Sequence, residues 1–358
     1  MSGNPAKENY TRWSVLTLSF TAAILVIFAS LTIYVDPLFH YHGPLKRFEY
    51  PLDNERYQND GITRNFTYSG LITGTSMTEN FKTSEAEALF GAPFVKVSFS
   101  GAYYKEIDNN LKRGFAAGKK ISCVICGLDY NKLCADKDSV RYSDYPAYLY
   151  NNYLLDDVYY VLNKSILFNQ TKRVLDYTAS GQKTTAFDQY ANWNARCTFG
   201  AEAVLATYSL GPAAESTVSL SDEERLKIVG NIRQNVTDLA DQYPGTDFYL
   251  FFTPYSICYW EDLQNTGVLE RQFDVEQTAI EELLKHPNIK LYCFFTDFET
   301  ICDLNNYKDI YHYGEWVNSW ILEQMYSGNY LLSEDNYLEH LAAMREFYTS
   351  YDYASLHR

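Results

Sequence analysis

The sequence predicts an α/β fold in which a parallel sheet follows a single membrane-spanning helix. From about residue 68 onward, short apolar runs typical of buried strands alternate with longer amphipathic segments. Strands that alternate with helices form parallel sheets with right-handed crossovers. Before that region, residues 13–35 run for 23 positions without a charged side chain, which is long enough to cross a bilayer with some tilt.

The chain begins with a short tail, residues 1–12, and the predicted span is followed by a connector at residues 36–66. We interpret residues 13–35 as an uncleaved signal anchor, because a signal peptide would have a shorter apolar core and a small-residue cleavage site. Two basic residues precede the span and two follow it, so the positive-inside rule does not decide its orientation. In the connector, His40 and His42 could be metal ligands or proton carriers, but we favour residues at the membrane interface because no third ligand lies nearby.

The remaining residues, 67–358, form the predicted α/β domain. A tyrosine-rich insertion without regular alternation, at about residues 133–220, follows the third strand. The predicted strands lie at residues 69–76, 94–102, 121–130, 247–256 and 289–298. The predicted helices lie at residues 83–91, 103–120, 221–244, 266–286, 313–326 and 333–348.

Composition excludes some classes of function. The net charge is −15, and no run of lysine and arginine offsets it, so we predict no binding of nucleic acid. The seven cysteines form no readable disulfide framework. Cys123 and Cys126 resemble a C-x-x-C chelate, but positions three apart on a strand point to opposite faces. We therefore predict two buried apolar side chains there, and no metal or cofactor in the protein.

Ser76 raises the question of catalysis, because it follows Gly74 and Thr75 at the end of the first predicted strand. Ligands of parallel α/β sheets bind outside the carboxyl ends of the strands. A serine hydroxyl attacks a carbonyl when a base accepts its proton and a carboxylate orients that base. Of the six histidines, only His312 has an acid in a suitable relation to it, since Asp309 three residues earlier would share one face of a turn. A helix cap and a surface histidine are the alternative interpretation of these residues.

The order of these short motifs along the chain resembles a known family. The chain carries G-x-S after the first strand, a glycine after the second, G-x-D after the third and D-x-x-H after the last. This order resembles the SGNH (GDSL-type) hydrolase superfamily over residues 70–135 and 290–325. The resemblance implies a flavodoxin-like parallel sheet. With the leading anchor, the chain looks like membrane-anchored Gram-positive bacterial members, which are related to D-alanine-transfer and polysaccharide O-acetylation proteins.

The resemblance also implies a role for each site residue. Ser76 would be the nucleophile, His312 the base and Asp309 the partner that orients it. The backbone N–H groups of Ser76 and Gly101 would donate to the oxyanion.

Two positions depart from the family pattern. Thr75 replaces the usual Asp before the serine, and Asp129 stands where the family has an Asn that donates to the oxyanion. An ionised carboxylate would repel the developing charge. Asp129 is therefore protonated, or does another job, or is replaced by Asn131 on the same strand face, or the site no longer catalyses.

The predicted function is that of a membrane-anchored serine esterase or acyltransferase. The resemblance implies acyl esters of a cell-envelope glycan or lipid as substrates, an acyl-serine intermediate and a catalytic domain outside the cytoplasm. The alternative is a non-catalytic envelope protein of the same fold that binds a polymer or a membrane acyltransferase.

Aromatic residues of the insertion could provide a surface on which a glycan stacks. Packing between helices is the favoured interpretation, because no groove can be derived from the sequence. The residues concerned are Tyr142, Tyr145, Tyr148, Tyr150 and Trp193.

Overall fold

The computed structural model describes residues 5–141 and 146–357, and it divides into two compact units. The first unit contains the described parts of residues 1–52, 56–66 and 145–185. The second contains residues 53–55, those of 67–144 that are described, and 186–357. Part of the tyrosine-rich insertion thus packs with the N-terminal residues, and part belongs to the sheet-containing unit.

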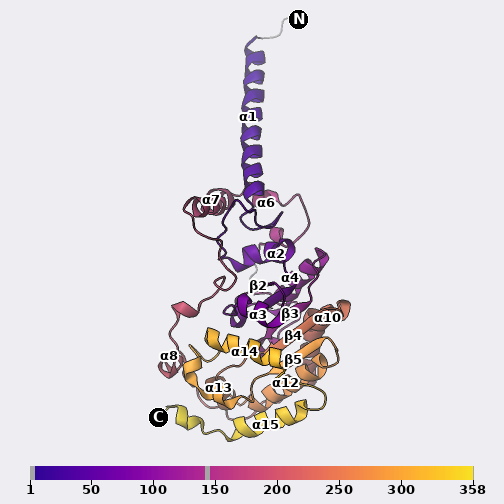
Figure 1. Cartoon of the computed structure of the whole chain (residues 1–358), viewed down its shortest axis with the longest axis vertical. Coiled ribbons are helices and arrows are strands. Elements are labelled where there is room, and N and C mark those ends of the chain that lie inside the picture. Colours follow the sequence, from indigo (N-terminus) through magenta and orange to yellow (C-terminus); the bar gives the residue numbers. More distant parts are fainter. Residues whose placement is uncertain (1–4, 142–145, 358) are drawn as a thin grey trace. The chain divides into compact units, whose positions relative to one another are not determined.

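The second unit is built on a five-stranded parallel sheet (Figure 1). Its strand order is β2-β1-β3-β4-β5, which is the order of flavodoxin-like folds. The predicted α/β fold class is therefore confirmed. The strands are β1 (Gly70–Gly74), β2 (Phe94–Ser98), β3 (Cys123–Leu128), β4 (Asp247–Phe252) and β5 (Ile289–Cys293).

Helices cover both faces of this sheet. On one face α3 (Thr83–Phe90) packs against α14 (Glu315–Ser327), and the Phe90 ring lies 5.1 Å from that of Tyr249 in β4. The opposite face carries α4 (Tyr104–Ala116), whose apolar side chains meet those of β3 and β4. The remaining helices of eight or more residues in this unit are α9 (Asp222–Ile232), α11 (Ile257–Asn265), α12 (Leu269–Leu283) and α15 (Tyr337–Ser350).

Shorter helical segments complete the second unit. They are η1 (Ser76–Thr78), α5 (Tyr130–Leu133), η4 (Asn194–Arg196), α8 (Ala201–Thr207), η5 (Arg233–Thr237), α10 (Asp238–Gln242), α13 (Phe298–Cys302), η6 (Leu304–Asn306) and η7 (Tyr353–His357).

The three strands nearest the predicted serine are buried along their whole length. Every residue of β1, β2 and β3 is buried, as expected for parallel strands covered on both faces. Cys123 and Cys126 are buried free thiols within β3, in agreement with their interpretation as apolar core residues.

One buried lysine connects the sheet to the turn that carries the serine. Lys96 in β2 donates from Nζ to the backbone carbonyls of Glu79 at 2.5 Å and Phe81 at 2.8 Å. Burial lowers the pKa of Lys96 to about 7, because desolvation disfavours the charged ammonium. The lysine thus holds the residues just after the serine turn against the second strand.

The first unit begins with α1 (Pro5–Val35), and within it residues 9–35 are long and apolar enough to cross a membrane. That finding rests on length and composition alone, and it agrees with the predicted span at residues 13–35. The other helical segments of this unit are α2 (Glu55–Asn65), η2 (Ala147–Leu149), α6 (Val158–Val161), η3 (Ile166–Thr171) and α7 (Lys172–Ala179).

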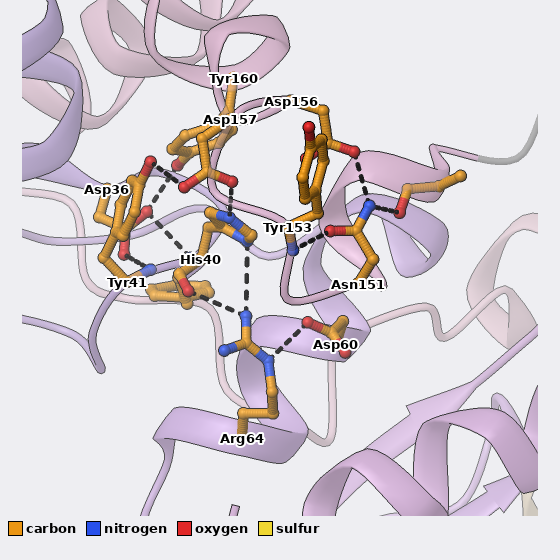
Figure 2. Close-up of polar contacts among 12 residues, drawn as sticks. Asp36, His40, Tyr41, Asp60, Arg64, Asn151, Tyr153, Asp156, Asp157 and Tyr160 are labelled. Carbon is orange, nitrogen blue, oxygen red and sulfur yellow. Dashed lines mark hydrogen bonds and ion pairs between the residues drawn. The ribbon is translucent and has the colours of Figure 1, made fainter.

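A buried aspartate ends the apolar helix. Asp36 has a positive φ of 46°, and its carboxylate accepts the backbone N–H groups of His40, Tyr41 and His42 at 2.8–2.9 Å. The hydroxyl of Tyr160, on α6, donates to the same carboxylate at 2.6 Å (Figure 2). The helix end is therefore bonded both to its own following turn and to the segment 146–185.

The histidine of the connector is part of the same network. His40 is only 8% exposed, and its Nε2 lies 3.1 Å from Asp157, which also accepts the Tyr41 hydroxyl at 2.9 Å (Figure 2). Arg64 of α2 donates to the carbonyl of His40 at 2.9 Å and to Asp60 at 2.7 Å. These bonds give His40 a structural role inside the first unit.

An apolar cluster supports this network. Leu38 packs with Leu149, Tyr160 and Ile166 of the insertion, and Tyr148 and Tyr150 lie against that cluster. The packing interpretation therefore holds for Tyr148 and Tyr150. Tyr142 and Tyr145, the other two insertion tyrosines considered for a glycan surface, lie outside the described residues.

Candidate active site

The predicted serine lies in a tight turn at the carboxyl end of β1. Gly74 ends the strand with a φ of +142°, and a Cβ atom there would lie 2.6 Å from Cγ2 of Thr78, so glycine is required. Ser76 then begins η1, which Thr75 caps by accepting the N–H of Met77 at 3.4 Å. Strand order reverses between β1 and β3, and this is where ligands bind in such sheets.

The predicted base and its partner lie in the loop that follows η6. Tyr307 and Tyr313 form an antiparallel bridge that closes this loop. Between them, Asp309 accepts the backbone N–H groups of Tyr311 at 2.9 Å and His312 at 2.8 Å. The turn therefore places the carboxylate beside the imidazole three residues later, as the spacing predicts.

The structure brings the three residues together. Oγ of Ser76 lies 2.9 Å from Nε2 of His312, although the two residues are 236 positions apart. Nδ1 of His312 lies 2.9 Å from both carboxylate oxygens of Asp309. Burial alone would raise the pKa of Asp309. The hydrogen bond and charge of His312 and the two backbone N–H groups lower it by more than burial raises it, so the pKa lies below its ordinary value. The carboxylate is thus ionised and can hold the Nδ1–H tautomer, which leaves Nε2 free to accept the serine proton.

Asp129 braces the serine turn. Its carboxyl group is buried, with Oδ2 accepting from the Thr75 hydroxyl and Oδ1 from the Tyr255 hydroxyl, each at 2.6 Å. The Tyr104 hydroxyl donates to its backbone carbonyl at 2.8 Å. Of the alternatives left open by the sequence, the geometry favours a job other than oxyanion stabilisation. Thr75 and Asp129 are hydrogen-bonded to each other, so the two departures from the family pattern form one feature.

The placement of Asn131 on a strand face beside Asp129 is wrong. β3 ends at Leu128, and the N–H of Lys132 donates to the carbonyl of Asp129 at 3.0 Å. That bond turns the chain into α5, and the side chain of Asn131 is exposed there. Asn131 therefore does not replace Asp129 across a strand face.

Gly101 lies in the turn after β2, with a φ of +64°. Among the residues that the structure describes, neither the N–H of Gly101 nor that of Ser76 donates a hydrogen bond. Both predicted oxyanion donors are thus available to a ligand.

Trp193 of the insertion lies beside the Ser76–His312 pair. Its indole N–H donates to the carbonyl of Ser76 at 3.3 Å, and its ring meets the imidazole of His312 edge-on at 5.6 Å. Nζ of Lys308 lies 4.2 Å from the centre of the indole ring, a cation–π contact. Trp193 thus lies at the candidate site. The sequence offered it as one of five aromatic residues that could stack against a glycan, with packing between helices as the favoured interpretation. The sequence did not predict that Tyr255 would hydrogen-bond to Asp129 or that Lys308 would lie over the Trp193 ring. It indicated only that residues after the strands would line the site.

Comparison with known proteins adds little to this geometry. No protein-family model matches the chain, and no curated protein matches it. A solved structure from Streptococcus pneumoniae, described provisionally as a platelet activating factor, is 10% identical, covering 76% of this chain and 89% of its own, with a TM-score of 0.39. A likeness of that size supports no argument about activity.

Replacing Asp129 by Asn should destabilise the protein by about 1–3 kcal/mol. The new amide N–H₂ would face the hydroxyl of Thr75 or Tyr255, each of which now donates to a carboxyl oxygen, so two donors would meet. Burial raises the pKa of Asp129 above 3.8, although its hydrogen bonds from Thr75 and Tyr255 oppose the shift. Its contribution to stability is therefore full below pH 3.8 and falls as the pH rises through the raised pKa.

Thermal unfolding of the full chain in detergent, between roughly pH 4 and pH 8, measures both effects. The Asn variant should lose this pH dependence. Asp136→Asn, at an exposed carboxyl after the same strand, should unfold like the wild type. Equal stability of the Asp129 variant and the wild type at every pH would contradict the bracing role.

Proposed function

We propose that this protein is a serine hydrolase or acyltransferase that cleaves acyl esters through an acyl-Ser76 intermediate. The observation that carries the proposal is the continuous chain of contacts from Ser76 through His312 to Asp309, with 2.9 Å at each link. Both distances lie within the range that general-base catalysis requires.

In the first step, Nε2 of His312 accepts the proton of Ser76 Oγ while Oγ bonds to the ester carbonyl carbon. Negative charge develops on the carbonyl oxygen, and the N–H groups of Ser76 and Gly101 are the donors available to it. The tetrahedral intermediate collapses by expelling the alcohol, which takes its proton from His312. Water or an acceptor hydroxyl then attacks the acyl-serine carbonyl carbon while His312 accepts its proton. The second tetrahedral intermediate collapses by expelling Ser76 Oγ, which takes that proton from His312.

The finer assignment is a membrane-anchored enzyme that acts outside the cytoplasm on an acylated cell-envelope glycan or lipid. It is supported by the apolar helix α1 and by the order of motifs described above. A substrate held in the envelope suits an enzyme anchored to the membrane, because the anchor keeps the site near it.

A non-catalytic binding protein is the alternative that the position of Asp129 suggested. Because both oxygens of that carboxyl group accept from Thr75 and Tyr255, the carboxyl acts on the turn that carries the serine. This arrangement removes the main argument against catalysis.

Labelling with a fluorophosphonate tests the proposal, because such probes react with a serine activated by an adjacent base. We expect the full chain, purified in detergent, to be labelled on Ser76 and to hydrolyse p-nitrophenyl acetate. Ser76→Ala should lose both. Ser122→Ala, at the opposite edge of the sheet where the hydroxyl donates to Ser69, should retain both. Equal labelling of the Ser76→Ala variant and the wild type would overturn the assignment.

A further inference from the structure

Three side chains that commonly bind metals converge at the end of the last strand. They are Glu276 of α12, Cys293 at the end of β5 and His340 of α15. One donor atom from each lies within 4.8 Å of the other two. Glu276 and Cys293 are completely buried. None of the three belongs to the serine site, and the sequence analysis did not single them out.

Two of the atoms that could bind a metal are buried without a hydrogen-bond partner. Oε2 of Glu276 and Nε2 of His340 make no hydrogen bond to any residue that the structure describes. The other carboxyl oxygen of Glu276 accepts from the thiol of Cys293 at 3.2 Å. A buried acceptor without a partner is costly, and native structures rarely contain one without a reason. A cation between these atoms would satisfy both at once.

The donor set selects the kind of cation. A carboxylate oxygen, a thiolate sulfur and an imidazole nitrogen together suit zinc, whereas calcium and magnesium prefer oxygen ligands alone. In a tetrahedral zinc site these atoms would lie roughly 3–4 Å apart. The three atoms, which now lie within 4.8 Å of one another, would have to come to that spacing when the ion binds.

The surroundings of the imidazole also suit a metal ligand. Nδ1 of His340 lies 3.4 Å from the hydroxyl of Thr296, which leaves the buried Nε2 as the nitrogen available to an ion. A second contact that fixes the ring in this way is usual for histidines that bind metals.

An open cavity lies beside one of the three ligands. His340 and Thr296 line an open cavity of about 540 Å³, whose wall also includes Glu339 and the segment 328–332. Nε2 of His340 is itself buried, so the imidazole ring would have to turn for an ion to enter from this cavity. Since the protein supplies three ligands, the fourth position would be open to water.

We propose that Glu276, Cys293 and His340 bind one zinc ion, with a water molecule as the fourth ligand. The ion would join α12 and α15 to the end of β5. On binding, the thiol of Cys293 gives its proton to solvent, and its hydrogen bond to Glu276 is replaced by the two bonds to the metal. The site is independent of the proposed esterase activity.

Titration with metal tests the proposal. The untagged full chain in detergent is stripped with a chelator, dialysed and titrated with Zn²⁺ by calorimetry. We expect one ion per chain and an increase in the unfolding temperature. Co²⁺ in place of Zn²⁺ should give a thiolate-to-cobalt absorption band.

Matched variants show which residues bind. His340→Ala should weaken Zn²⁺ binding more than the roughly 10- to 100-fold that the loss of an outer contact costs. Glu276→Gln, which keeps the shape of the buried side chain, should weaken it comparably, and Cys293→Ser should lose the cobalt band. His286→Ala, at a histidine bonded to Asp241, should bind like the wild type. Absence of binding to the wild type would overturn the proposal, as would equal binding by His340→Ala.

Discussion

Asp309→Asn should lower ester turnover by about 10³- to 10⁴-fold, because the amide cannot hold His312 in the catalytic tautomer. The carboxylate now accepts Nδ1–H of His312. An amide N–H₂ at the same place would favour the tautomer with hydrogen on Nε2, which cannot accept the proton of Ser76. Asn still offers an oxygen to the backbone N–H groups of Tyr311 and His312, so the loop should stay folded.

The pH–rate profile and fluorophosphonate labelling of the full chain measure this effect. Asp303→Asn is the matched control, since Asp303 caps η6 shortly before the same loop and makes no contact with His312 in the described structure. Turnover by the control should stay within a few-fold of the wild type. An Asp309→Asn variant that keeps full turnover would show that the contact with His312 is only structural.

Gly61→Ala should destabilise the first unit by about 3 kcal/mol or more, as expected for an atom forced into packed backbone. Gly61 lies in α2, and a Cβ there would lie 2.6 Å from the carbonyl oxygen of Phe39 and closer still to that of Leu38. Neither oxygen is at the end of a flexible side chain. α2 would have to move away from the turn that follows the apolar helix.

Gly230 in α9 provides the control, because a Cβ there meets nothing within 4 Å. Gly230→Ala should stabilise its helix by about 0.5–1 kcal/mol. Apparent unfolding temperature and proteolysis within residues 145–185 report on the two variants. If Gly61→Ala resisted heat and protease as well as Gly230→Ala does, α2 would not pack as closely against the turn at Leu38 as the structure shows.

The sheet could be predicted from the sequence because its strands are nearly continuous apolar runs between amphipathic helices. α2 could not, because its buried face carries Gln58, Asn59 and Asp60, so no apolar stripe marks it. α5 was mistaken for the end of a strand, since Tyr130 is as apolar and as buried as the residues of β3. The turn there depends on a backbone hydrogen bond that sequence patterns do not show.

The candidate site was predictable in part for a similar reason. Ser76, Asp309 and His312 follow strands or share one turn, so the order of motifs along the chain was informative. Trp193 is 117 positions from Ser76 and lies in an insertion without a regular pattern. The bracing role of Asp129 depends on the hydroxyl of Tyr255, 126 positions away. Such contacts arise from tertiary packing alone.

For the membrane-anchored protein proposed above, the division of the insertion between two units has a consequence for release by proteolysis. Residues 146–185 pack with the N-terminal part that contains α1, so the chain passes between the units several times. A single cut after residue 66 would leave a fragment that still contains Tyr160, whose hydroxyl is bonded to Asp36 at the end of α1. In the membrane-anchored protein proposed above, one cleavage would therefore not separate the sheet-containing unit from α1. Release would also require residues 146–185 to separate from that helix.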